Sequence, residues 1–123
     1  QASIFHQFKK QANQGSIKPF KNSENYYRDF IYVGDICRIT EKFLDIDESG
    51  IWNIGSGRAE SIGNVANWMS NRLNVPVEEV EMPESLNGQY QEWTQSDNTK
   101  LLDTIGDFKF TTPYEWMDKW IQD

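Results

Sequence analysis

A polar segment with two tyrosines and an arginine is the part of this sequence best suited to bind an anionic ligand. Residues 21–28 read Lys-Asn-Ser-Glu-Asn-Tyr-Tyr-Arg. The planar guanidinium of Arg28 can donate two parallel hydrogen bonds to a diphosphate, and a polar loop can receive a nucleobase. The competing interpretation is a surface loop in which Arg28 pairs with a carboxylate, for example that of Asp29. The residues alone favour the surface loop, because most polar loops bind no ligand.

Three other places have side chains that could contact a ligand, and each also has a plainer structural explanation. His6 is the only histidine, so it could bind a hydroxyl or phosphate group or be an ordinary residue of the first helix. The turn at residues 55–57, Gly-Ser-Gly, resembles a phosphate-binding turn, but a tight strand-to-helix connection explains it equally well. Tyr90, between two glutamines, could bind sugar hydroxyls or pack over the edge of the core.

The sequence lacks the residues that several kinds of catalytic, metal and cofactor site require. One histidine and one cysteine argue against a zinc site of conventional ligands, and no local context supports a nucleophile–histidine arrangement. No two carboxylates stand out as a glycosidase pair. The sequence has neither a glycine-rich dinucleotide-binding turn nor a Tyr-x-x-x-Lys pair. We therefore expect no catalytic residue, no metal ligand and no cofactor-binding residue within this chain.

Composition and charge argue against nucleic acids and membranes as binding partners. The 123 residues carry a net charge of −7, which disfavours sequence-independent binding to nucleic acid. No apolar run approaches the ~20 residues that a membrane span requires. The single cysteine, Cys37, excludes an internal disulfide and fits a reducing compartment. We expect a cytoplasmic protein with no nucleic-acid or membrane partner.

The elements that must position these residues form a mixed α/β pattern of about four helices and a few short strands. Apolar spacing predicts a first helix over residues 2–14, and later helices capped by Asp35 and by Ser61. A short helix is expected after Asp97, and a last helix from Pro113. Extended segments are expected at residues 28–33, 51–54 and 77–82. The chain opens within a helical segment rather than a first strand, so we expect a fragment of a longer protein.

Two segments at this spacing resemble the second half of the extended short-chain dehydrogenases/reductases. They are Arg-Asp-Phe-Ile-Tyr-Val-Gly-Asp at residues 28–35 and Trp-Asn-Ile-Gly-Ser-Gly at residues 52–57. Three finer features resemble one group of these enzymes, the ADP-L-glycero-D-manno-heptose 6-epimerases. They are Ser-Glu-Asn at 23–25, Gly-Arg-Ala-Glu-Ser at 57–61, and Gly-Gln-Tyr-Gln at 88–91 leading into Trp-Thr-Gln-Ser-Asp. The resemblance covers nearly the whole chain.

The resemblance implies that residues 1–123 are the small C-terminal substrate-binding domain of a longer enzyme. In that family, a bound NADP oxidises the heptose at C6 to a ketone and returns the hydride to the opposite face. The product is the heptose precursor of lipopolysaccharide. The catalytic residues and the NADP-binding Rossmann domain lie upstream in the family, so we expect this chain alone to be inactive and to bind no cofactor. The family also forms homo-oligomers.

Matching positions imply a set of residues that contact the nucleotide sugar. The loop at residues 20–23 corresponds to the one that receives the nucleotide, and Arg28 to an arginine that contacts the diphosphate. Ser96 stands where the family usually has alanine, near an expected pocket wall. The full substrate-binding set is His6, Phe20, Lys21, Asn22, Ser23, Arg28 and Tyr90.

Two alternatives remain open. The chain could belong to another UDP- or GDP-sugar epimerase or dehydratase, or it could be a non-catalytic binding or assembly module. An assembly module predicts an exposed apolar patch on the first helix. Apolar surface would also lie bare wherever a Rossmann domain normally packs.

Overall fold

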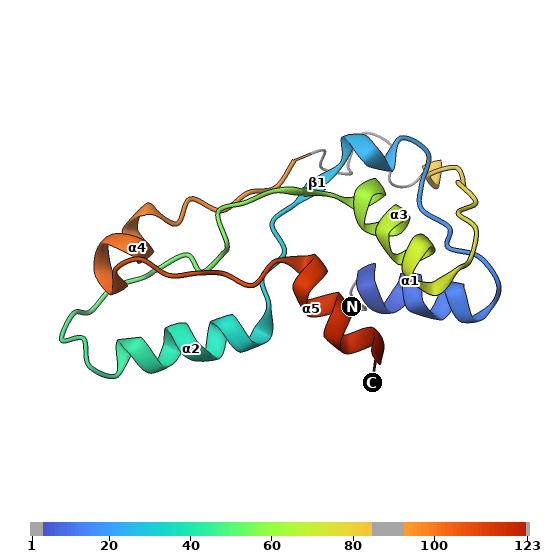
Figure 1. Cartoon of the computed structure of the whole chain (residues 1–123). Coiled ribbons are helices and arrows are strands. Elements are labelled where there is room, and N and C mark those ends of the chain that lie inside the picture. The colour runs from blue at the N-terminus through green and yellow to red at the C-terminus, as the bar shows by residue number, and fades with distance from the viewer. Residues whose placement is uncertain (1–3, 85–92, 123) are drawn as a thin grey trace. The chain divides into compact units, whose positions relative to one another are not determined.

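The computed structural model describes residues 4–84 and 93–122 (Figure 1). The fold is mixed α/β, as predicted, and the described residues form five α-helices and a two-stranded sheet. The elements in chain order are α1 (Ile4–Asn13), η1 (Ser23–Asn25), β1 (Tyr27–Arg28), α2 (Val33–Phe43), β2 (Glu60–Ser61), α3 (Ile62–Leu73), α4 (Thr99–Ile105) and α5 (Pro113–Gln122). The chain divides into two compact units, Gln1–Arg28 with Glu60–Trp93, and Asp29–Ala59 with Thr94–Asp123.

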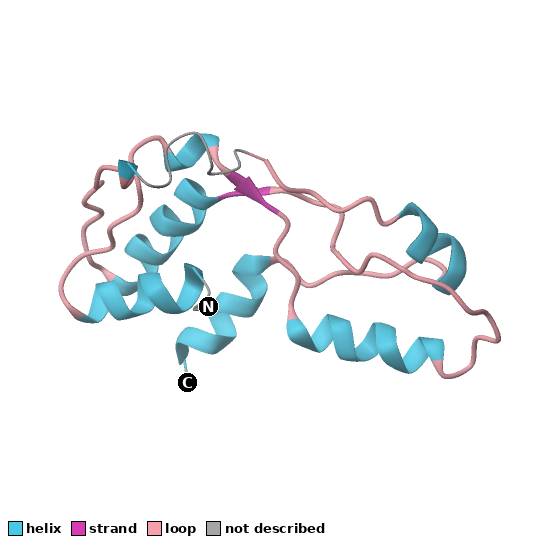
Figure 2. Cartoon of the chain, turned by 180° about the vertical axis from the view of Figure 1, so that it is seen from behind, coloured by secondary structure: helices cyan, strands magenta, loops and turns pink. Residues whose placement is uncertain are grey.

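The core of the first unit lies between α1 and α3, which run side by side in Figures 1 and 2. The apolar residues of α1 recur at helical spacing, so Phe5, Phe8 and Ala12 share one buried face. α3 contributes Val65 and Met69, both fully buried. Covering a large apolar side chain stabilises a fold by about 1.5–3 kcal/mol, so this helix pair holds the first unit together.

The ends of these helices follow from local side-chain chemistry. The Ser61 hydroxyl accepts a hydrogen bond from the Asn64 backbone N–H at 3.2 Å, which confirms the predicted N-cap of α3. α3 ends at Leu73, and the C-cap residue Asn74 has a φ of 62°, in the left-handed region that asparagine tolerates. α1 ends at Asn13, and Gly15 follows with a φ of 118°. The predicted glycine stop is therefore confirmed.

Two extended segments of the first unit run parallel to each other. The Ile17 N–H donates to the Pro76 carbonyl at 3.0 Å, and the Glu78 N–H donates to the Ile17 carbonyl at 2.8 Å. Further bridges pair Ile17 with Val77 and Phe20 with Val80. These bridges agree with the predicted extended segment around residues 77–82. They also fix one end of the loop that carries the candidate site.

The second unit contains α2, α4 and α5, with Ile39, Leu101 and Met117 fully or almost fully buried. Three predictions here were wrong. The strand predicted over residues 51–54 is contradicted, because no strand or bridge in the described part of the chain includes these residues. The helix predicted to be capped by Asp35 begins at Val33, and Asp35 lies buried in its first turn. The strand predicted over residues 28–33 ends at Arg28, because α2 already includes Val33 and Asp29 turns to bind another loop.

The start of α5 confirms one prediction and adds a feature that the sequence analysis missed. Pro113 is the first residue of the helix, as predicted. The Glu115 N–H donates to the Thr112 hydroxyl at 3.2 Å, and the Thr112 N–H donates to the Glu115 carboxylate at 3.4 Å. This reciprocal pair is a capping box, written in the sequence as Thr-Pro-Tyr-Glu. Within residues 4–84 and 93–122, no helix has the length and apolar content to cross a bilayer.

Candidate functional site

The predicted nucleotide loop is a short turn anchored at both of its ends. At its start, the Lys21 N–H donates to the Val80 carbonyl at 2.8 Å. At its end, Ser23 is buried and begins the η1 turn. Asn22 stands between them, exposed and in the left-handed region with a φ of 64°. The exposed tip of this loop therefore presents an amide side chain beside an ammonium group.

The ammonium group of Lys21 lies against a carboxylate of the neighbouring extended segment. Its Nζ is 2.6 Å from Oε1 of Glu81, and both side chains are largely exposed. The hydrogen bond to Glu81, with that carboxylate's charge, raises the pKa of Lys21 above its usual value. Lys21 is therefore cationic at neutral pH, but an anionic ligand would have to compete with Glu81 for it.

The η1 turn is fastened to the start of α3 by a close backbone contact. A Cβ added to Gly63 would lie 2.6 Å from the Glu24 nitrogen, so no larger residue fits there without a shift. The Ser61 hydroxyl donates to the Glu24 carbonyl at 3.0 Å, and the Ile62 N–H donates to the Tyr26 carbonyl at 2.8 Å. Sequence analysis missed Gly63, although a glycine within an apolar helix face is itself a sign of close approach.

Arg28 lies at the end of β1, directly after η1. Its Nη1 donates to the Tyr27 carbonyl at 2.7 Å, and Arg28 is in register with Glu60 of the antiparallel strand β2. Successive residues of a strand face opposite sides. The Tyr27 ring accordingly packs on the ring of Trp93, with centroids 4.4 Å apart. The structure therefore separates the Tyr27 ring from the half-buried Arg28 side chain, which the sequence had grouped together.

The described part of the predicted set lies in the first unit. Phe20, Lys21, Asn22, Ser23 and Arg28 belong to one stretch that runs through η1 into β1. His6 lies on α1 with an exposed side chain. Tyr90 lies outside the described residues. Five of the seven predicted residues are thus held on one anchored segment.

The Gly-Ser-Gly turn of the second unit has its polar groups directed to a carboxylate of the protein itself. Oδ1 of Asp29 accepts from the Ser56 N–H at 3.0 Å and the Ser56 hydroxyl at 2.6 Å. Oδ2 accepts from the Gly57 N–H at 3.0 Å. Two backbone N–H groups that could hold a phosphate therefore bind Asp29 instead. This agrees with the interpretation of residues 55–57 as a structural turn.

Ser96 completes the same cluster, which is a different role from the pocket wall that the resemblance implied. Its N–H and its hydroxyl donate to Oδ2 of Asp29 at 2.9 and 2.8 Å. Burial acts to raise the pKa of the Asp29 carboxyl, but the hydrogen bonds from Ser56 and Ser96 outweigh it and hold that pKa below its usual value. Asp29 thus joins two loops of the second unit.

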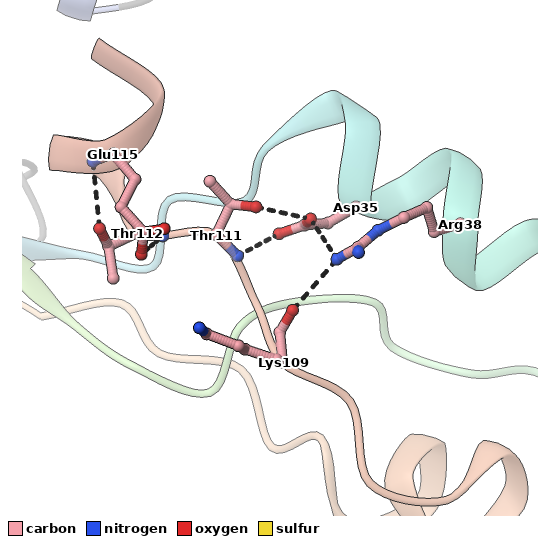
Figure 3. Close-up of polar contacts among 6 residues, drawn as sticks. All are labelled: Asp35, Arg38, Lys109, Thr111, Thr112 and Glu115. Atoms are coloured by element: carbon pink, nitrogen blue, oxygen red, sulfur yellow. Dashed lines mark hydrogen bonds and ion pairs between the residues drawn. The ribbon is translucent and has the colours of Figure 1, made fainter. Parts of the chain in front are cut away.

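Another carboxylate, which is buried, joins α2 to the segment before α5 (Figure 3). Asp35, only 1% exposed, accepts from the Thr111 N–H at 2.6 Å and from the Thr111 hydroxyl at 3.0 Å. Arg38 donates to Asp35 at 3.0 Å and to the Lys109 carbonyl at 3.1 Å. The bonds to Thr111 and Lys109 connect α2 to the segment before α5, so we interpret Asp35 as a structural residue.

An open depression of about 620 Å³ lies on the second unit, whereas the described residues of the predicted set belong to the first unit. Its lining includes Glu48, Asp97 and Asp103 with one cation, Lys100. The Lys100 ammonium donates to the Ile51 carbonyl at 2.7 Å. This excess of carboxylates disfavours a diphosphate. In the part of the chain that the structure describes, no group of three or more potential ligands could hold a metal ion.

No protein-family model matches the chain. Solved structures with a similar fold include an NAD-dependent NDP-hexosamine 5,6-dehydratase of tunicamycin biosynthesis, at 16% identity and a TM-score of 0.78. They also include the ADP-L-glycero-D-manno-heptose-6-epimerase of Helicobacter pylori, at 17% identity and a TM-score of 0.77. A third is the UDP-N-acetylglucosamine 4-epimerase of Methanobrevibacter ruminantium, at 21% identity and a TM-score of 0.74.

The matches cover almost all of this chain but a minority of each neighbour. They include 98, 97 and 98% of the chain and 40, 36 and 40% of the three neighbours, respectively. The chain therefore has the fold of one part of these epimerases and dehydratases and spans about two fifths of their length.

Proposed function

We propose that this chain is the C-terminal substrate-binding portion, over residues 1–123, of a nucleotide-sugar epimerase. The substrate we propose is ADP-glycero-manno-heptose, which the whole enzyme would invert at C6 by NADP-mediated oxidation and re-reduction. The observation that carries the proposal is the anchored segment that holds the loop at residues 20–23 and Arg28 together in one unit. The fold shared with nucleotide-sugar epimerases and dehydratases supports the same class of enzyme.

Each residue of the proposed site has a role that fits its chemistry. The Arg28 guanidinium would bind the diphosphate, since it can donate two parallel hydrogen bonds to phosphate oxygens. The exposed Asn22 amide and the Lys21 ammonium would contact the nucleoside end, with Phe20 and Ser23 shaping the loop. His6 and Tyr90 would bind the sugar. None of these residues is proposed to carry out the hydride transfer.

The residues present do not fit an NADP site, so we derive no catalytic step from this chain. The sequence has no glycine-rich turn of the dinucleotide-binding kind. The one Gly-x-Gly turn, at residues 55–57, donates two of its N–H groups to Asp29. We propose that NADP binds a Rossmann domain outside these residues, that the enzyme is a cytoplasmic homo-oligomer, and that this chain alone is inactive.

A second candidate is an enzyme acting on a UDP- or GDP-sugar. The UDP-N-acetylglucosamine 4-epimerase is 21% identical to the chain, and the ADP-heptose epimerase is 17% identical. A guanidinium binds any nucleoside diphosphate, so Arg28 does not distinguish the candidates. Selectivity would come from the loop at residues 20–23. For the third candidate, an assembly module that uses the first helix, the structure offers less support, because Phe5 and Phe8 of α1 are buried.

A calorimetric titration of the purified chain with ADP, UDP and GDP, then with ADP-sugars, tests the proposal. We expect weak binding with a preference for ADP, because only part of a cleft is present. Replacing Arg28 with alanine removes a charge-assisted contact worth about 1.5–3 kcal/mol, so affinity should fall by roughly 10- to 150-fold. Arg72→Ala, an exposed site on α3, makes the same charge change as a control.

The outcomes separate the candidates. If Arg28→Ala and Arg72→Ala lowered nucleotide affinity equally, the binding would come from general charge attraction, and the proposed site would be contradicted. A preference for UDP or GDP with a selective Arg28 effect would favour the second candidate. If none of the nucleotides binds even at millimolar concentration, the proposal that this chain holds the substrate is wrong.

A further inference from the structure

The Lys21 side chain lies within a local excess of negative charge. Its Nζ is 2.6 Å from Oε1 of Glu81, and the negative charges of Glu81 and, less strongly, of Glu79 both act to raise the pKa of Lys21. Two carboxylates acting on one ammonium give this end of the loop a net negative charge, which repels a phosphate group. The diphosphate of a nucleotide therefore belongs at Arg28 rather than at Lys21.

The ion pair of Lys21 and Glu81 is not needed to hold the loop in place. The Lys21 N–H donates to the Val80 carbonyl at 2.8 Å, and the Val80 N–H donates to the Pro19 carbonyl at 2.9 Å. Backbone hydrogen bonds therefore already join the two segments. The side chains of Lys21 and Glu81 are 55% and 77% exposed, and so exposed an ion pair contributes little to stability. Both charged groups are accessible to a ligand.

The same ion pair presents hydrogen-bond donors directly beside acceptors. An ammonium has three N–H donors and a carboxylate has about four acceptor positions, so one contact between them exhausts neither group. The pairing edge of a nucleobase also carries a donor beside an acceptor. In adenine an exocyclic amino group adjoins an unprotonated ring nitrogen, and in hypoxanthine a carbonyl adjoins a ring N–H, which is the reverse order. Because a base is uncharged, the negative charge around Lys21 does not repel it.

We infer that Lys21 and Glu81 together bind the pairing edge of the nucleobase, and that Glu81 determines which base is selected. For adenine, the Glu81 carboxylate accepts from the exocyclic amino group, and the Lys21 ammonium donates to the adjoining ring nitrogen. Because Arg28 holds the diphosphate, the direction in which the base enters is set, and the order of donor and acceptor decides which base fits. This inference rests on the proposed function and adds Glu81 to the residues proposed to contact the ligand.

Calorimetric titrations of the chain with ADP and with inosine diphosphate test the inference, because the two ligands share the ribose diphosphate and differ at the pairing edge of the base. We expect ADP to bind about three- to tenfold more tightly, less than a buried charged hydrogen bond would give, because the site is exposed. The double variant Lys21→Glu with Glu81→Lys exchanges donor and acceptor and keeps the net charge. It should invert the preference, so that inosine diphosphate binds about three- to tenfold more tightly than ADP.

A matched control makes the same charge changes elsewhere in the first unit. The double variant Lys10→Glu with Glu78→Lys alters two exposed positions, one on α1 and one on the extended segment. It should leave the ratio of the ADP and inosine diphosphate affinities unchanged, because neither side chain contacts the base. All four altered side chains are exposed, so the melting temperatures of both double variants should stay within about 4 °C of that of the unaltered chain.

The outcomes separate this inference from the proposed function. If the unaltered chain bound the two diphosphates equally, the inference would be overturned and the proposed function would stand, since Arg28 alone would explain the binding. A preference for ADP that survives the exchange of Lys21 and Glu81 would also overturn the inference. A preference for inosine diphosphate that the exchange inverts would support binding of the base edge and contradict ADP as the nucleotide. If neither diphosphate binds at millimolar concentration, the proposed function and the inference both fail.

Discussion

The Asp29 cluster is the sharpest test of the structural account, because one carboxylate accepts five hydrogen bonds from two loops. Two donors, both from Ser56, meet Oδ1, and three, from Gly57 and Ser96, meet Oδ2. The substitution Asp29→Asn keeps the size of the side chain but replaces one oxygen with a donor group. We expect it to destabilise the chain.

The magnitude follows from the donors that lose their acceptor. In the better orientation, the new amide group replaces Oδ1, and the Ser56 hydroxyl can rotate to accept from it. The Ser56 backbone N–H then has no acceptor, which costs about 1–3 kcal/mol. The remaining bonds change from charged to neutral acceptors, at about 0.5–1 kcal/mol each. Since Asp29 is only partly buried, solvent compensates for some of the loss, and we expect a net cost of about 2–3 kcal/mol.

Thermal unfolding followed by circular dichroism measures this cost. For a chain of this size, the expected loss lowers the melting temperature by roughly 8–12 °C. Asp47→Asn makes the same charge change at an exposed position and should shift the melting temperature by no more than about 2 °C. If Asp29→Asn behaves like this control, the hydrogen-bond cluster does not stabilise the fold and the reasoning is refuted.

The pH dependence of the same variant gives an independent check. Folding lowers the pKa of Asp29 below its ordinary value near 3.8. A lowered pKa contributes stability that is fully present above the unfolded-state value and is lost as the pH falls through the folded-state value. The difference in unfolding free energy between the unaltered chain and Asp29→Asn should therefore be largest near pH 6–7 and shrink as the pH falls below about 4. If this free-energy difference did not change with pH, the claim that an ionised Asp29 accepts these hydrogen bonds would be contradicted.

Three further substitutions test other contacts by chemical denaturation. Gly63→Ala should destabilise the chain by about 1–2 kcal/mol, because the Cβ of the new alanine would clash with the Glu24 backbone. Helix propensity alone predicts that the variant is about 1 kcal/mol more stable, and that result would contradict the close contact. Asp35→Ala should cost about 3 kcal/mol, since it leaves buried donors unpaired, whereas a cost under 1 kcal/mol would show that water replaces the carboxylate. Thr112→Ala should cost about 1 kcal/mol through loss of the α5 capping box, and Thr112→Ser should restore most of it.

Local sequence signals predicted the parts of the fold that depend on neighbouring residues. Ser61 as the cap of α3, Pro113 at the start of α5 and the apolar face of α1 each depend on interactions within a few residues. At these three places the tertiary structure agrees with the local signal. The mixed α/β class follows from the same periodicities.

Long-range contacts explain what the sequence analysis missed. Asp35 looked like a helix cap because aspartate before an apolar run usually is one, but its partner Thr111 is 76 residues away. Ser96 looked like a pocket residue, and its partner Asp29 is 67 residues away. Residues 51–54 have the composition of a strand, yet a strand needs a neighbour, and no strand or bridge in the described part of the chain includes these residues.

The candidate site comes from sequence resemblance, and its role in binding stays a prediction. Sequence resemblance selected residues 20–23 and Arg28, and the structure places them on one anchored segment. Periodicity could not reveal that the Tyr27 ring packs on Trp93, or that Lys21 pairs with Glu81. Both contacts join segments more than 50 residues apart in sequence.

The central claim is that the first unit binds a nucleotide sugar through this segment. An NMR titration of the ¹⁵N-labelled chain with an ADP-sugar maps binding residue by residue. The account predicts saturable shifts concentrated at residues 20–23 and at the amide and guanidinium groups of Arg28, which Arg28→Ala abolishes. Shifts centred on the depression around Lys100, or no saturable shifts for ADP-, UDP- and GDP-sugars, would contradict it.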